Sequence, residues 1–88
     1  MSDEYPREEE LKTITEWPSD WPALMAYVKH LWWAADWGWT QKEERYNIST
    51  GGWSGNESLI SAMAQNFVFW AACWENHRRG GHYTFIVK

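Results

Sequence analysis

Few side chains in this sequence are spaced for catalysis. His30, His77 and His82 can act as bases near neutral pH, but no serine, cysteine or carboxylate pairs with them at a recognisable catalytic spacing. The single cysteine, Cys73, lies among aromatic residues, where a buried thiol is the usual arrangement. No Cys and His spacing resembles a zinc site. We therefore expect no catalytic residue, no metal and no cofactor, and we interpret the protein as a non-enzyme.

A glycine-rich segment is the first candidate for binding. The chain reads Gly-Gly-Trp-Ser-Gly-Asn-Glu over residues 51–57, directly before an apolar run with helical spacing. Backbone N–H groups ahead of a helix can bind a phosphate or a carboxylate, although the lysine of a P-loop and the GxGxxG spacing are both missing. A capped turn is the more ordinary explanation of the same glycines. An anion site here would use Gly51, Gly52, Ser54, Gly55, Arg78, Arg79 and His82.

The sequence is also rich in tryptophan. Nine Trp, four Tyr and three Phe make up 18% of the 88 residues, more rings than one small core holds easily. Exposed Trp and Tyr are typical of protein–protein hot spots, whereas isolated surface aromatics are also common. We predict a partner-binding surface, which a homodimer would use equally well, made of Trp33, Trp37, Trp39, Trp53 and Phe69.

Local patterns predict the elements that position these residues. Ser19 or Asp20 can cap a first helix, and Ser54 with Glu57 forms a capping box at the start of a second. The second helix is expected to end at the glycines of residues 80–81. Its buried face is expected at Leu59, Ile60, Met63, Phe67, Trp70 and Trp74. Four strands are expected at residues 11–17, 37–41, 45–50 and 82–87.

The resulting order of elements is β-α-β-β-α-β. It predicts the α+β class, a two-layer sandwich with two helices on a small antiparallel sheet, and it favours a ferredoxin-like topology. A chain of 88 residues holds one core, so we expect a single domain over residues 11–88 after an acidic, flexible leader at residues 1–10.

Charge and hydropathy limit the partners. Residues 1–20 hold seven acids and two bases, a net charge of −5, and the whole chain has a net charge of −4. Nucleic acid is therefore not expected as the main ligand, since phosphate binding favours a basic surface. No apolar run approaches the roughly 20 residues that span a bilayer, and no secretory signal is recognisable. With the lone cysteine, these features predict a cytoplasmic protein without a membrane partner.

The second half of the chain resembles a known group of proteins. Its GGWSGNE segment at residues 51–57 and its RGGHY segment at residues 79–83, with Phe69-Trp70 and Cys73-Trp74 between them, are similar to segments of small uncharacterised proteins encoded by phages and prophages. The resemblance covers about residues 50–88. It implies a phage origin and residence in a bacterial host cytoplasm, and it implies no reaction.

These observations lead to one main hypothesis and two alternatives. The main hypothesis is a non-catalytic phage protein that binds a host or phage protein, inhibiting a host defence system by steric occlusion in the manner of an anti-CRISPR protein. Its acidic leader would oppose a basic groove by mimicking nucleic-acid phosphate. One alternative is an accessory module that binds a small anionic ligand or nucleic acid at Gly51–Glu57, and the other is a self-associating structural or assembly component.

Overall fold

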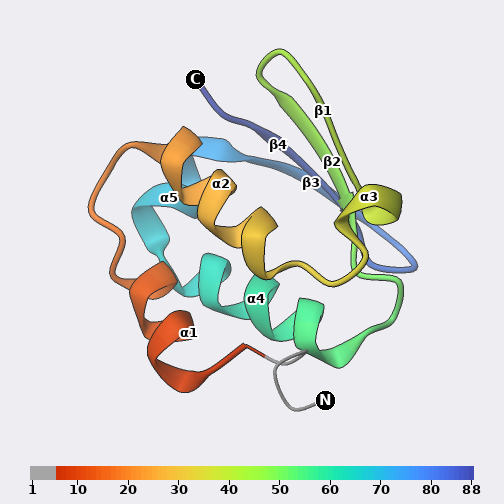
Figure 1. Ribbon diagram of the computed structural model, residues 1–88. Helices are drawn as coiled ribbons and strands as arrows, with labels where there is room; N and C mark the ends of the chain where they lie inside the picture. The colour runs from red at the N-terminus through yellow and green to blue at the C-terminus, as the bar shows by residue number, and fades with distance from the viewer. Residues whose placement is uncertain (1–5) are drawn as a thin grey trace.

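A layer of helices packs on one face of a four-stranded sheet (Figure 1). The computed structural model describes residues 6–88 of the chain. In chain order the elements are α1 (Glu8–Thr15), α2 (Trp21–Leu31), α3 (Ala35–Gly38), β1 (Trp39–Lys42), β2 (Arg45–Ser49), α4 (Ser54–Gln65), α5 (Phe67–Cys73), β3 (Trp74–Arg78) and β4 (His82–Ile86).

The sheet consists of two antiparallel hairpins lying side by side. Its strand order is β1-β2-β4-β3, and β2 pairs with β4 so that Tyr46 stands opposite Phe85. The α+β class and the two-layer sandwich with an antiparallel sheet are confirmed. The order of elements differs from the expected β-α-β-β-α-β, because the chain opens with a helix and supplies its third strand after α5. The sheet is therefore built from two neighbouring hairpins and does not have the expected ferredoxin-like topology.

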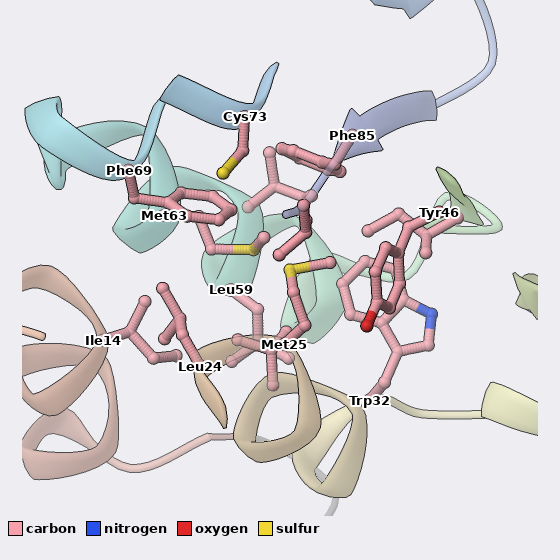
Figure 2. Close-up of a cluster of buried hydrophobic side chains, with 14 of the residues drawn as sticks. Ile14, Leu24, Met25, Trp32, Tyr46, Leu59, Met63, Phe69, Cys73 and Phe85 are labelled. Atoms are coloured by element: carbon pink, nitrogen blue, oxygen red, sulfur yellow. The ribbon is translucent and has the colours of Figure 1, made fainter. Parts of the chain in front are cut away.

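The core lies between the two layers, and Figure 2 shows its central side chains. Alternation along β2 turns Tyr46 and Ile48 toward the helices and leaves Arg45 and Asn47 exposed, as expected for a sheet with one covered face. The helices contribute the fully buried side chains Ile14, Leu24, Met25, Val28, Leu59, Met63 and Phe69.

Several predicted elements are confirmed. The α2 helix begins after Asp20, whose carboxylate accepts a hydrogen bond from the Ala23 N–H over 3.4 Å. The strands β1, β2 and β4 lie within two residues of their predicted bounds. The α4 helix begins at Ser54, but Trp53 occupies the N-cap position, so the predicted capping box is wrong.

The segment predicted as the first strand is the helix α1. Its Thr and Ile content is typical of a strand, yet the Glu10 side chain accepts a hydrogen bond from the Arg7 N–H over 2.7 Å and stabilises a helix start. Helical spacing turns Ile14 fully into the core. Residues 8–10 of the expected leader form the first turn of α1, and residues 1–5 lie outside the described residues.

The long second helix divides at Asn66. The Asn66 side chain caps α5 by accepting from the Phe69 N–H over 3.3 Å, and it donates to the carbonyls of Ile14 and Trp17 over 3.0 and 2.9 Å. After α5 the chain continues as β3, because β4 provides a backbone partner for it. Gly80 and Gly81, with φ of +86° and +78°, form the turn of this hairpin rather than a helix cap.

The described helices are also short. None of the helices within residues 6–88 is long and apolar enough to cross a membrane.

The Asn66 contacts predict a large loss of stability in Asn66→Ala. Removing a buried amide that forms three hydrogen bonds leaves two carbonyls without their donor, so we expect the free energy of unfolding to fall by about 2–4 kcal/mol. Urea denaturation followed by circular dichroism measures it. The exposed neighbour variant Gln65→Ala is the control and should change stability by less than about 0.5 kcal/mol. Equal stability of the two variants would contradict the role of Asn66.

Candidate functional site

The most unusual surface of the protein is the outer side of α5. All seven residues of this helix are apolar, yet only Phe69 and Cys73 are buried. Figure 2 shows both of these side chains directed into the core. Phe67 and Val68, in contrast, are 82% and 66% exposed. A helix of this composition normally lies inside a protein, so the exposure of its outer side is unusual.

The exposed apolar side chains form one patch. Residues four apart on a helix are neighbours, which groups Phe67 with Ala71 and Val68 with Ala72. Trp74 follows at the start of β3 and stacks on the half-buried Trp70 with ring centroids 5.9 Å apart. We call this set the α5 surface, and it comprises Phe67, Val68, Ala71, Ala72 and Trp74.

A depression borders the α5 surface on the side of the C-terminus. It has a volume of about 560 Å³, and Trp21, Ala72 and Trp74 line it. Glu75 and Lys88 are the charged residues in its lining. The α5 surface therefore combines protruding apolar side chains with a neighbouring hollow, a shape that suits contact with another protein.

Sequence reasoning missed the α5 surface because it extended α4 without interruption. An uninterrupted helix would place Phe67 on the buried stripe and Phe69 outside it. The break at Asn66 rotates the following residues, so that Phe69 is fully buried and Phe67 is exposed. The prediction of Phe69 as a partner-binding residue is therefore wrong. A polar Asn inside an apolar run was the signal that could have located the break.

The predicted tryptophan surface is only partly exposed. Trp33 and Trp37 are exposed by 44% and 67%, and Trp33 stacks on the half-buried Trp53 with ring centroids 5.0 Å apart. Trp39 is buried against Trp32, so its place in a binding surface is wrong.

Gly38 explains why Trp37 is exposed while Trp39 is buried. A side chain there would come within 2.7 Å of the Ser49 carbonyl, so glycine allows β2 to approach closely. The α3 helix ends at Gly38 and β1 begins at Trp39, so the two flanking tryptophans do not share the parity of one strand. Trp39 consequently faces the core while Trp37 remains outside.

The glycine loop does not present its backbone donors to a ligand. Gly51 and Gly52 form an exposed turn with φ of +63° and +75°. Their N–H groups donate to the hydroxyls of Ser49 and Thr50 over 3.4 and 3.3 Å, and the Trp53 N–H donates to the Thr50 carbonyl over 3.0 Å. These contacts close the loop on itself, which weighs against an anion cradle.

Asn56 completes this closed loop from the first turn of α4. Its buried side chain accepts from the Trp33 N–H over 2.9 Å and donates to the carbonyls of Trp33 and Thr50 over 3.1 and 3.4 Å. Ser54 and Gly55 occupy the same turn, and Gly55 is buried. The GGWSGNE segment is thus a structural junction between α2, β2 and α4.

The arginine corner adjoins this junction. The Thr50 N–H donates to the Gly81 carbonyl over 3.0 Å, and a side chain at Gly81 would collide with the Thr50 hydroxyl. Arg78 and His82 stand opposite each other on β3 and β4. With Trp37 they line a shallow depression of about 150 Å³. Arg79 lies in the hairpin turn, and neither arginine forms an ion pair within residues 6–88.

Several of the remaining titratable side chains are buried or pack against another ring. Burial raises the pKa of the Cys73 thiol. Burial, and then the negative charge of Glu57, raise the pKa of Tyr83. His77 stacks on Tyr83 with ring centroids 4.1 Å apart. No group of three His, Cys, Asp or Glu residues that could hold a metal occurs within residues 6–88.

Comparisons with known proteins identify no family for this chain, so its function has to be inferred mainly from the structure. No family model, no curated protein and no solved structure matches this chain. The resemblance to phage proteins stays a prediction.

The position of Cys73 predicts slow reaction with thiol reagents. Because the side chain is buried and its pKa lies above the ordinary value of 9.0, the folded protein should react with iodoacetamide at least about tenfold more slowly than the unfolded chain at pH 7. The rate should still rise above about pH 10, where an exposed thiol is already largely ionised. Alkylation followed by mass spectrometry measures both rates, and equal rates would contradict the buried position.

Proposed function

We propose that this protein is a non-catalytic binding protein that attaches to another protein, encoded by a host or a phage, through the α5 surface. The exposure of Phe67 and Val68 carries this proposal. Scattered apolar residues on a surface are ordinary, but here two adjacent large ones lie exposed on an entirely apolar helix. Contiguous exposed apolar patches on small proteins are commonly binding sites.

The chemistry of the α5 surface favours a protein as the partner. No side chain of α5 carries a charge, so the patch would contact an apolar hollow or a hydrophobic helix in the partner. Trp74 at its edge is the residue type that contributes most to hot spots, and the stack on Trp70 holds its ring in place before binding.

The proposal includes an inhibitory action by occlusion. Without a catalytic group of its own, the protein would inhibit its partner by covering part of the partner's surface. The resemblance to phage proteins supports a host defence complex as that partner, and the acidic N-terminal segment supports a partner with a basic groove. Glu8 and Glu9, both exposed on α1, would then stand where nucleic-acid phosphate normally binds.

A charge variant tests the α5 surface. Phe67→Glu places a carboxylate at the first residue of α5, where the helix dipole tolerates it, but it puts an unpaired charge into the interface. We expect the partner captured from host lysate by the tagged protein to bind at least about 30-fold more weakly, measured afterwards by calorimetry with that purified partner. Gln41→Glu, which adds the same charge on β1, should bind like the wild type.

Two results would contradict this proposal. One is equal binding of Phe67→Glu and Gln41→Glu to the captured partner. The other is capture of no protein by the wild type together with a molecular mass that doubles at high concentration in size-exclusion chromatography. The second result would assign the α5 surface to a homodimer, as expected for a structural or assembly component.

The acidic segment gives a separate prediction. Changing Glu8 and Glu9 to Gln should lower the rate of association with a partner that has a basic groove, and it should weaken the dependence of that rate on salt. Stopped-flow mixing at two salt concentrations measures this effect. An unchanged salt dependence would remove phosphate mimicry from the proposal.

A further inference from the structure

The outer face of the sheet, turned away from the helix layer, is open and polar. The strand register places one polar residue from each strand side by side across it: Thr40, Asn47, Thr84 and Asn76. The Thr84 hydroxyl donates to Oδ1 of Asn47 over 2.9 Å, which fixes the orientation of that amide. Within residues 6–88 nothing accepts a hydrogen bond from the Asn47 NH₂ group, so it remains a donor for a ligand.

Trp37 stands at one end of this face as a fixed aromatic platform. The residue is 67% exposed, yet the Cζ3 edge of its ring packs on Gly51, where an added Cβ would lie only 3.1 Å away. The depression that Trp37 shares with Arg78 and His82 measures about 150 Å³. Pockets for small molecules usually hold about 300–1,000 Å³, so a ligand here would lie across the face rather than inside it.

The charge of this face differs from that of the whole protein. The acids of the N-terminal segment that the structure describes lie in α1 and the connection to α2, within the helix layer (Figure 1). Arg78 lies on the outer face of the sheet, without an ion pair in the described part of the chain. The opposite end of the sheet has a net charge of −1, because two cations are accompanied there by three carboxylates: Lys42, Arg45, Glu43, Glu44 and Glu75.

We propose that this face binds single-stranded nucleic acid, with a base stacked on Trp37 and the neighbouring phosphate held by Arg78 and His82. Stacking on an exposed ring requires an unpaired base and tolerates any base, which favours a single strand over a duplex. The Asn47 NH₂ group donates to an oxygen of the base or the sugar. The shallow form of the site fits a polymer that crosses the strands, and the cation beside the ring favours a phosphate over a neutral sugar.

The test measures fluorescence anisotropy of a fluorescein-labelled oligothymidylate of about ten nucleotides at low salt. We expect saturable binding by the full-length protein. Trp37→Ala should weaken the affinity about tenfold, because the stacked base loses its platform. Arg78→Gln should weaken it several-fold and reduce the slope of log affinity against log salt by about one, because one phosphate contact disappears.

Two control variants keep the test specific. Trp33→Ala removes another exposed tryptophan that lies outside the depression, and it should retain the affinity within about twofold. Phe67→Glu should also bind the oligonucleotide normally, while Trp37→Ala should still capture the protein partner. The two surfaces are thereby tested independently. A thermal melt by circular dichroism for each variant shows that a loss of binding is not a loss of folding.

Four results would overturn the proposal. They are the absence of saturable binding at low salt, equal affinity of Trp37→Ala and the wild type, equal affinity for a duplex of the same length, and equal affinity for thymidine monophosphate. The last result would assign the face to a free nucleotide.

Discussion

The arrangement of the helix layer depends on the side chain of Asn66. This one amide accepts a hydrogen bond from the first turn of α5 and donates two to the end of α1 and the residues after it. It therefore interrupts α4, starts α5 in a new direction and joins both to α1. Because these groups are buried, each hydrogen bond is costly to lose, which favours the break in the helix at Asn66.

Two chemically different surfaces follow from this arrangement. The new direction of α5 turns Phe69 and Cys73 inward and leaves Phe67 and Val68 outside, which creates an apolar surface on the helix layer. The hairpin that follows α5 pairs β3 with β4 and sets Arg78 on the outer face of the sheet. An apolar surface and a polar surface that carries Arg78 thus lie on different layers of one small domain.

Sequence reasoning succeeded where signals are local and failed where partners are distant. The Asp20 cap predicted α2, and alternating residues with glycine breaks predicted β1, β2 and β4. Residues 11–17 were mistaken for a strand because the burial of Ile14 decides their conformation, and that burial depends on packing of α1 against α4. The β3 strand has no exposed and buried alternation of its own, since all its residues are exposed, and only pairing with β4 defines it. Of the predicted binding residues, Trp33 and Trp37 are exposed, whereas Trp39 and Phe69 belong to the core.

Binding through the α5 surface requires that Phe67 lie outside in the free protein and become covered in the complex. Hydroxyl-radical footprinting of the monomer, read by mass spectrometry, tests it directly because it compares Phe67 with Phe69 on the same helix. We expect rapid oxidation of Phe67, protection of Phe69, and loss of Phe67 oxidation when the captured partner is bound. Equal protection of both residues in the free monomer would contradict it.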